Sequence, residues 1–420
     1  MTPALVVWLF SVGLGLRLSS DRSRLSIALP IVLRSFLGIY LLFGFVLCLI
    51  FSAAPVWGSV GRLVPALLDR SLQPEARWNL LRHLFSLVAY APLALLLLPI
   101  DFLAACVSRR LFSCVHPVFI CGTPRSGSTL LHRLLIESCP EFYGYTHFEW
   151  RYPSLSIQVF AQLTGLKSIA SDRNYWSGSP VEHVVSRMHP NKLGDYEEDA
   201  ILFEERCGHH PYQFLHLPRY RLNFAFSQHS SNASSGRLAR FYSFVISSLS
   251  LLKPANSLFL SKEVASNERL PALSKRFSSS KFIVITRRPS SYLSSLRPLL
   301  ELSTLSKTGS RAHLEDPEWW PTWYEWLVGQ ANMAARFYAS FSLSHPERIC
   351  HVRFEDLLAD PRSEILRILD FCGLPPSPEF ESIMSRHISS QEARARGYDY
   401  GPVDHDPFDY DLFYRVFYPS

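Results

Sequence analysis

The sequence feature that most constrains the fold is the stretch 117–132, PVFICGTPRSGSTLLH. It begins with an apolar run typical of a buried strand, passes through a turn bounded by Gly122 and Gly127, and ends in a helical pattern. The first amide groups of a helix have no intrahelical partners, and the helix dipole adds partial positive charge there. The stretch therefore predicts a strand, a tight turn and a helix N-terminus that binds an anion.

The residues of the turn indicate which kind of anion it would bind. Its glycine spacing is that of a Walker-type phosphate loop, but Ser128 occupies the position of the usual lysine. Arg125 lies inside the turn instead, and its planar guanidinium can hold an oxyanion through two parallel hydrogen bonds. An ordinary strand-to-helix turn would explain the two glycines alone. The arginine and the Ser128-Thr129 pair favour anion binding.

The run 123–131, TPRSGSTLL, resembles the 5′-phosphosulfate loop of sulfotransferases that use 3′-phosphoadenosine 5′-phosphosulfate (PAPS). It is most similar to the broad branch that carries Pro-Arg-Ser-Gly where cytosolic members carry Pro-Lys-Ser-Gly. The resemblance implies an α/β fold, a P-loop-like three-layer domain with a central parallel sheet. It also implies PAPS as the sulfuryl donor and no metal. The donor-binding residues that it implies in the loop are Arg125, Ser126, Gly127, Ser128 and Thr129.

Two further apolar runs, 257–262 and 281–286, predict strands buried on both faces, as in a parallel sheet. The first run ends at Lys262, and Arg287 follows the second. In open α/β sheets, ligands bind beyond the carboxyl ends of the strands. We therefore expect Arg125, Lys262 and Arg287 to meet at one site.

The same positions extend the resemblance to sulfotransferases. It implies that Arg287 and Ser295 hold the 3′-phosphate of the donor, with Arg288 able to exchange roles with Arg287. Lys262 resembles the active-site lysine of the family. A strand, turn and helix near the C-terminal end also match, so that the implied sulfotransferase domain covers residues 115–376.

The implied reaction moves a sulfuryl group in line to a hydroxyl or amine, and it needs a general base for the acceptor's proton. Residues 143–150 predict a second strand running into a loop, and the resemblance places an acidic base there, which makes Glu149 the first choice. The rival histidines are His147, His183, His189, His209 and His210. The acidic runs 196–199 and 203–205 are interpreted as solvated helix faces. The acceptor, whether saccharide, lipid, small molecule or protein, stays open.

Two alternative functions compete with this one. A P-loop kinase or NTPase is disfavoured by the missing loop lysine and by the lack of an apolar strand that ends in a magnesium-binding aspartate. The second alternative function is that of a membrane-resident protein that binds the nucleotide without catalysis. A base within hydrogen-bond reach of the transferable group would separate an enzyme from a binding protein.

Residues 1–110 have a different character. The run 35–57 carries no charge and is long enough to cross a hydrocarbon core of about 30 Å. A second run, 84–107, contains one carboxyl group, Asp101. The two runs are candidate transmembrane helices of a hydrophobic hairpin, and buried helices packed on the catalytic domain are the alternative. Arginines flank both runs so evenly that the positive-inside rule does not set an orientation.

Membrane-bound enzymes of this resemblance often work in the Golgi lumen, so we expect a membrane protein with a lumenal catalytic domain. The triplet Asn232-Ala233-Ser234 is an N-glycosylation pattern compatible with that location. Residues 377–420 are expected to form a C-terminal extension. Forty-two Lys+Arg against 36 Asp+Glu suits an anionic ligand but is far from the excess of a nucleic-acid-binding protein. The eight cysteines show no metal-ligand spacing.

Overall fold

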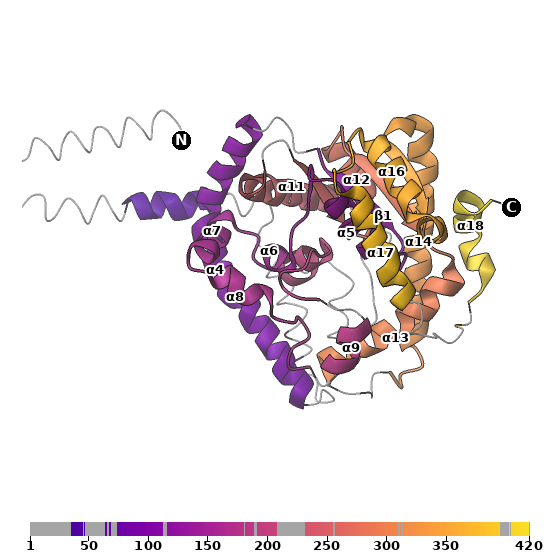
Figure 1. The fold of residues 1–420 in the computed structure, drawn as a ribbon. Helices are drawn as coiled ribbons and strands as arrows, with labels where there is room; N and C mark the ends of the chain where they lie inside the picture. Colours follow the sequence, from indigo (N-terminus) through magenta and orange to yellow (C-terminus); the bar gives the residue numbers. More distant parts are fainter. Residues whose placement is uncertain are drawn as a thin grey trace, which may run out of the picture.

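The computed structural model describes residues 35–44, 74–111, 116–179, 181–188, 191–207, 232–254, 257–309, 314–394 and 405–419, with a few isolated positions besides. At its centre lies a five-stranded sheet in the order β2-β3-β1-β4-β5 (Figure 1). All four strand pairs are parallel, which confirms the predicted central parallel sheet. The strands are β1 (Val118–Gly122), β2 (Phe142–Tyr143), β3 (Leu258–Lys262), β4 (Lys281–Thr286) and β5 (Ile349–Arg353).

Helices cover both faces of the sheet. Alternate residues of β1 point to opposite faces, as the pleat of a strand requires. Val118 and Ile120 pack with α5 (Ser128–Ser138), α16 (Pro361–Cys372) and α17 (Phe380–Arg394). Phe119 and Cys121 pack with α11 (Asn232–Leu249), α14 (Trp319–Ser344) and α18 (Asp411–Phe417). The sheet is therefore the middle of three layers.

The other α-helices surround these layers or cover the ends of the strands. They are α4 (Pro74–Leu111), α6 (His147–Arg151), α7 (Leu155–Leu163), α8 (Leu166–Ser171), α9 (Glu182–Met188), α10 (Ala200–Leu202), α12 (Leu270–Arg276), α13 (Pro289–Thr308) and α15 (Phe354–Ala359). A π-helical turn, Phe203–Cys207, follows α10.

The region 143–150, predicted as a second strand running into a loop, ends in a helix instead of a loop. β2 ends at Tyr143, and α6 begins at His147. The Thr146 side chain accepts a hydrogen bond from the backbone of Glu149, whose carboxylate in turn accepts one from the backbone of Thr146. This capping box satisfies two otherwise unpaired backbone donors and starts a helix where a loop was expected.

The predicted membrane helix at 84–107 is part of α4, which packs against α7, α11 and α13. Asp101 is buried, and it accepts hydrogen bonds from the backbone and the hydroxyl of Ser156 at 3.1 and 2.8 Å. In the part of the chain that the structure describes, no single helix is long and apolar enough to cross a membrane. Two segments of α4, Arg77–Ala94 and Leu96–Val107, pass that test only together, as a pair bent by 62°.

Only part of the other predicted span can be compared. Residues 35–44 are helical, whereas nearly all of the rest of 35–57 lies outside the described residues. The predicted hydrophobic hairpin is therefore not confirmed. Domain boundaries at 110 and 376 stay predictions, although α17 and α18, both beyond 376, pack into the two hydrophobic layers.

Candidate active site

The phosphate loop depends on two glycines. Gly122 has φ of 134°, and a Cβ there would lie 1.9 Å from the carbonyl oxygen of Ile285 on the neighbouring strand. Gly127 has φ of 83°, and its Cβ would lie 2.3 Å from the ring of Phe354. Arg125 also has positive φ, at 59°. Left-handed residues two positions apart form the kind of turn that gathers backbone N–H groups around an anion.

The start of α5 is open to a ligand. Gly127 is its N-cap, no side chain caps it, and its first turn holds no acidic residue. Ser126 does not occupy the helix end, because its hydroxyl donates to the carbonyl of Thr123 at 2.5 Å. Ser128 and Thr129 line a cavity in front of the helix. The free N–H groups and the helix dipole therefore favour negative charge at this end of the cavity.

Both predicted arginines reach the same place. The Nε atom of Arg125 donates to the hydroxyl of Ser295 on α13 at 3.1 Å, and Nη1 of Arg287 donates to the carbonyl of Arg125 at 3.3 Å. Arg125 and Arg287 both line the cavity. Arg288 is exposed and lies over the ring of Tyr418, 4.9 Å from its centroid. Of the two neighbouring arginines, Arg287 is thus the one that faces the site.

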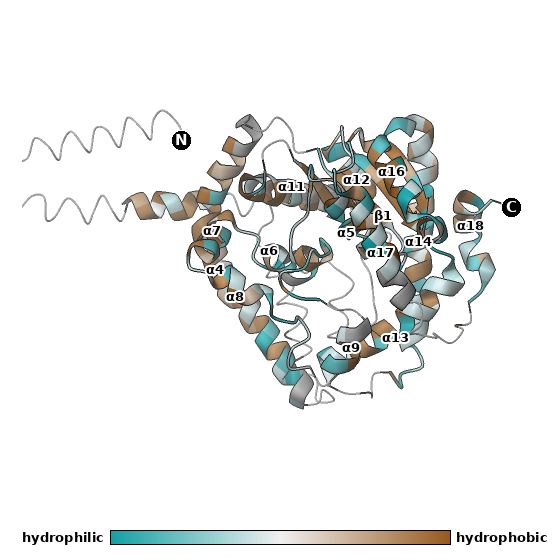
Figure 2. Cartoon of the chain, viewed as in Figure 1, coloured by the Kyte–Doolittle hydropathy of each residue, from teal (hydrophilic) through white to brown (hydrophobic). Residues whose placement is uncertain are grey.

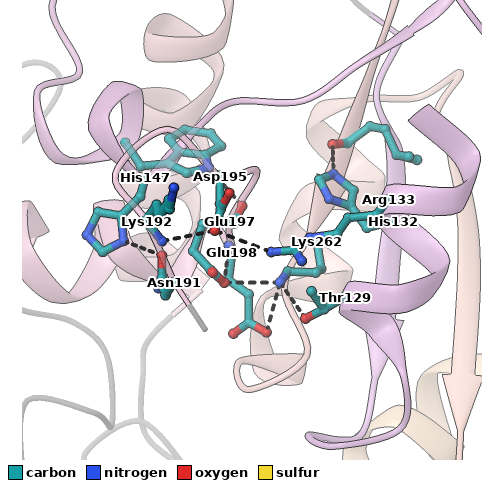
Figure 3. A network of polar contacts seen from close by, with 12 residues as sticks. Thr129, His132, Arg133, His147, Asn191, Lys192, Asp195, Glu197, Glu198 and Lys262 are labelled. Carbon is teal, nitrogen blue, oxygen red and sulfur yellow. Dashed lines mark hydrogen bonds and ion pairs between the residues drawn. The ribbon is translucent and has the colours of Figure 1, made fainter. Parts of the chain in front are cut away.

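Lys262, at the end of β3, forms the centre of the polar network in Figure 3. Its ammonium donates to the Thr129 hydroxyl at 2.9 Å and to a carboxylate oxygen of Glu197 at 3.1 Å. A carboxylate oxygen of Glu198 lies 3.4 Å away. Burial alone would lower the pKa of Lys262, but Glu197 and Glu198 outweigh burial and raise it. The ammonium is therefore charged at neutral pH.

The segment that carries these acids was misread from the sequence. Glu197 and Asp199 are only 4% and 2% exposed, so the interpretation of 196–199 as a solvated helix face is wrong. The backbone N–H of Asp199 donates to the carbonyl of Lys262 at 3.0 Å, which fixes the segment to the end of β3. A signal was present, because a lysine at the end of a buried strand needs a nearby counter-charge.

Asp199 is the centre of a second buried cluster of polar side chains, next in the chain to Glu197 and Glu198. Its carboxylate accepts hydrogen bonds from the hydroxyls of Tyr242 and Ser261, the latter at 2.5 Å. Burial raises the pKa of Asp199 to about 7 although both hydrogen bonds oppose the shift. Because Ser261 precedes Lys262 on β3, the cluster connects the acidic segment to the strand that positions the lysine.

The structure places Glu149, the predicted general base, outside this network. One carboxylate oxygen accepts from Lys167 and Lys253 at 3.0 and 2.8 Å, and the other from the backbone of Thr146 at 2.8 Å. Burial alone would raise the pKa of Glu149, but the two lysines outweigh it and lower that pKa. Glu149 does not border the cavity. Its placement gives no support to a role as base, and it explains the residue as a helix cap and ion-pair partner.

The two rival histidines that the structure describes lie outside the cavity lining. His147 is buried, and its Nδ1 lies 3.3 Å from the amide oxygen of Asn191. Neither His147 nor His183 lines the cavity. The other three rivals, His189, His209 and His210, lie outside the described residues. His387 and Arg386 of α17 do line it, and sequence reasoning missed both because α17 lies beyond the region of resemblance.

The cavity has a volume of about 760 Å³ and combines three kinds of wall. The phosphate loop and the arginines form a cationic side, and Glu197 and Glu198 form an acidic one. The apolar part comes from several elements, and one face of α13 contributes Leu296, Leu299 and Leu300 to it. An apolar pocket with a few converging polar groups is typical of a small-molecule site. This cavity is large enough for a nucleotide-sized ligand.

Comparisons with known proteins agree with this geometry. A model of the sulfotransferase family matches residues 117–378. The fold is similar to that of sulfotransferase STF9 from Mycobacterium avium, with 16% identity, a TM-score of 0.56, and coverage of 86% of this chain and 89% of that one. Sulfotransferase STF1 from Mycobacterium tuberculosis H37Rv gives 16% identity, a TM-score of 0.54, and coverage of 91% and 98%. No curated protein sequence matches this chain significantly.

Proposed function

Because the chain belongs to the sulfotransferase family, we propose that it transfers a sulfuryl group from PAPS to a hydroxyl or amine of an acceptor. The observation that carries the proposal is the position of Lys262. Its ammonium contacts both Thr129, in the first turn after the phosphate loop, and the carboxylates of Glu197 and Glu198. Lys262 therefore connects the expected donor site to the expected acceptor side of one cavity.

The residues around the loop fit a donor with two anionic groups. The backbone N–H groups at the start of α5, with Ser128 and Thr129, would hold the phosphosulfate, whose activated sulfuryl group is the chemistry that PAPS supplies. Arg287 and Ser295 would hold the 3′-phosphate. The hydrogen bond between Arg125 and Ser295 places Arg125 beside this second group of ligands. Cations and oriented N–H groups at both places would neutralise a donor of high negative charge.

The roles of the lysine and the acids follow from their exposure and contacts. A charged Lys262 would stabilise the negative charge that develops on the oxygen leaving the sulfuryl group. One carboxylate oxygen of Glu197 already accepts from Lys262 and from the backbone of Glu198, at 3.1 and 3.0 Å. The side chain of Glu198 is 15% exposed against 4% for Glu197. We assign Glu198 as the general base and Glu197 as the residue that positions Lys262.

The alternatives fit this arrangement less well. A P-loop kinase or NTPase relies on a loop lysine, which is Ser128 here, and on a magnesium-binding aspartate at a strand end. A protein that only binds the nucleotide would need Glu197 to compensate the charge of Lys262, but it has no need of a second carboxylate, Glu198, that lies 3.4 Å from the ammonium and also lines the cavity. The pairing of Lys262 with Glu198 thus supports catalysis over binding alone.

Ligand preference tests the proposed donor. The purified protein should bind adenosine 3′,5′-bisphosphate without magnesium and bind it more tightly than ATP, as measured by isothermal calorimetry. Sulfur-labelled PAPS should then transfer its label to a component of a membrane or soluble extract, and fractionation of that extract would identify the acceptor class. Tighter binding of magnesium–ATP than of the bisphosphate would reject the proposal.

A further inference from the structure

The outer side of α4 is an unusually apolar surface. Its solvent-facing apolar residues recur at intervals of three to five positions along the helix and are between 43% and 75% exposed. They are Trp78, Leu81, Phe85, Val88, Leu93, Leu96, Ile100, Leu103 and Val107. Single exposed apolar residues are common on soluble proteins, but a contiguous series of this length marks an interaction surface.

Neighbouring elements extend this surface. α7 contacts α4, and α8 follows α7 closely. The turn between α7 and α8 and its flanks expose four large apolar side chains, Phe160, Leu163, Leu166 and Ile169, which are 61%, 82%, 49% and 76% exposed. Figure 1 shows α4, α7 and α8 on the same side of the molecule, and Figure 2 shows hydrophobic residues along α7 and the adjoining part of α4.

The helix at 35–44 joins the same surface. The Tyr40 hydroxyl donates to the carbonyl of Leu96 at 2.6 Å, and the Phe43 ring lies 6.0 Å from that of Phe102. Its own apolar residues point mostly to solvent. We call the outer side of α4, the α7–α8 turn and helix 35–44 together the apolar face.

The chain beyond this helix indicates what covers the apolar face. The described helix 35–44 ends at this face. In the sequence, the uncharged run continues beyond Gly44 for 13 more positions. The sequence of α4 has arginines near both ends, at 77, 82, 109 and 110, and its two acids are Glu75 and the buried Asp101. An apolar stripe between arginines suits a helix that lies in a lipid interface, because arginine side chains reach the headgroups.

The packing of α4 indicates which side of the helix would face a lipid interface. Its inner side contacts α7, α11 and α13, and Asp101 on that side is held by Ser156. Pro99 has no N–H for the carbonyl of residue 95, which lies at the bend between the two halves of α4. We propose that the apolar face rests on a lipid surface, with α4 in the plane of the interface and the catalytic domain on its inner side.

An environment-sensitive probe tests this proposal. The full chain would carry an azide-bearing amino acid at position 163, to which a nitrobenzoxadiazole dye is attached by cycloaddition so that the eight native cysteines stay unlabelled. The same labelled amino acid at position 343 is the matched control. Leu343 is 89% exposed on α14, a helix that Figure 1 shows on a different side of the molecule from α4, α7 and α8. With phosphatidylcholine–phosphatidylserine vesicles, the probe at 163 should shift to the blue and be quenched by brominated acyl chains. The probe at 343 should do neither. A probe at 163 that stays in water while the protein is vesicle-bound overturns the proposal.

A charge substitution provides the second measurement. Phe85 is 75% exposed, so that Phe85→Glu removes no core contact. It should lower partitioning to these vesicles about tenfold, the scale of withdrawing one large apolar side chain from lipid. Leu343→Glu should leave partitioning unchanged, and equal partitioning of both variants and the parent contradicts the proposal. A lipid-free dimer that Phe85→Glu converts to monomer would assign the face to a second copy and also overturn it.

Discussion

A buried ammonium organises the polar contacts at the end of β3. Lys262 is fully buried, and removing a charge of this kind from water is costly unless partners compensate. Thr129, Glu197 and Glu198 supply that compensation, and the two carboxylates keep the lysine charged. A charged lysine held behind the cavity wall by these partners is the basis of its proposed role in stabilising negative charge on a departing oxygen.

The Asp199 cluster gives a residue-scale prediction about pH. Burial raises the pKa of Asp199 from 3.8 to about 7, so between these values the folded protein binds a proton that the unfolded chain has lost. The free energy of unfolding therefore falls as pH rises through that window. Asp199→Asn should flatten the decrease in melting temperature between pH 5 and 8, measured by thermal unfolding at constant ionic strength. Asp172→Asn, at an exposed site, is the control, and an unchanged slope for Asp199→Asn would count against the cluster.

The two neighbouring arginines give a second residue-scale prediction. Arg287→Ala should weaken binding of adenosine 3′,5′-bisphosphate by about 2–4 kcal/mol, the scale of losing one partner of a buried charge pair. Arg288→Ala should have a much smaller effect, because Arg288 lies over Tyr418 outside the cavity. Calorimetry on both variants measures the difference. Equal losses would show that Arg287 has no special contact with the ligand.

At the scale of elements, local sequence signals predicted the elements that depend on local chemistry. The apolar runs at β1, β3 and β4 identified three parallel strands. The helix expected near the C-terminal end is α16, whose first turn is capped by Asp360, which accepts from the backbone of Ser363 at 3.0 Å. At α6 the apolar and aromatic composition suggested a strand, whereas the Thr-x-x-Glu spacing of a capping box was the better indicator.

The hydrophobic N-terminal runs were harder to interpret for a physical reason. A helix that packs against lipid and a helix that is buried in protein have the same apolar sequence pattern, so only tertiary contacts distinguish a membrane helix from a core helix. For α4 these contacts are with α7, α11 and α13, together with the hydrogen bonds of Asp101 to Ser156, 55 positions away. Such distant pairings leave no periodic signal in the sequence.

The strand-to-loop junction gives an element-scale prediction. Gly122→Ala places a Cβ 1.9 Å from the Ile285 carbonyl at a backbone φ of 134°. Strand β1 must then move away from β4, which should lower the free energy of unfolding by at least ~2 kcal/mol. Gly165→Ala is the matched control, because φ there is also positive, at 73°, but nothing lies within 4 Å. Denaturant unfolding of both variants checks the difference, and equal losses would contradict the close approach.

At the scale of the whole molecule, the site joins segments far apart in the sequence. The sequence predicted that Arg125, Lys262 and Arg287 would meet, because parallel strands end at one edge of a sheet. The two arginines line the cavity, and Lys262 donates to Thr129 on the cavity wall. The sequence did not predict that Glu197 would contact Lys262, 65 positions away. That contact depends on how the covering segment folds back over β3, and no local pattern specifies it. The contribution of α17 to the cavity was missed for the same reason.

The measurement that tests the central claim most directly compares two glutamates. With sulfur-labelled PAPS and the acceptor found for the parent protein, Glu198→Gln should lower turnover by about 10²–10⁴-fold, the usual worth of a general base. Its affinity for adenosine 3′,5′-bisphosphate should stay unchanged. Glu149→Gln should retain most of the turnover, because Glu149 pairs with Lys167 and Lys253 outside the cavity. Near-normal turnover in Glu198→Gln, with loss of turnover in Glu149→Gln, would contradict this account.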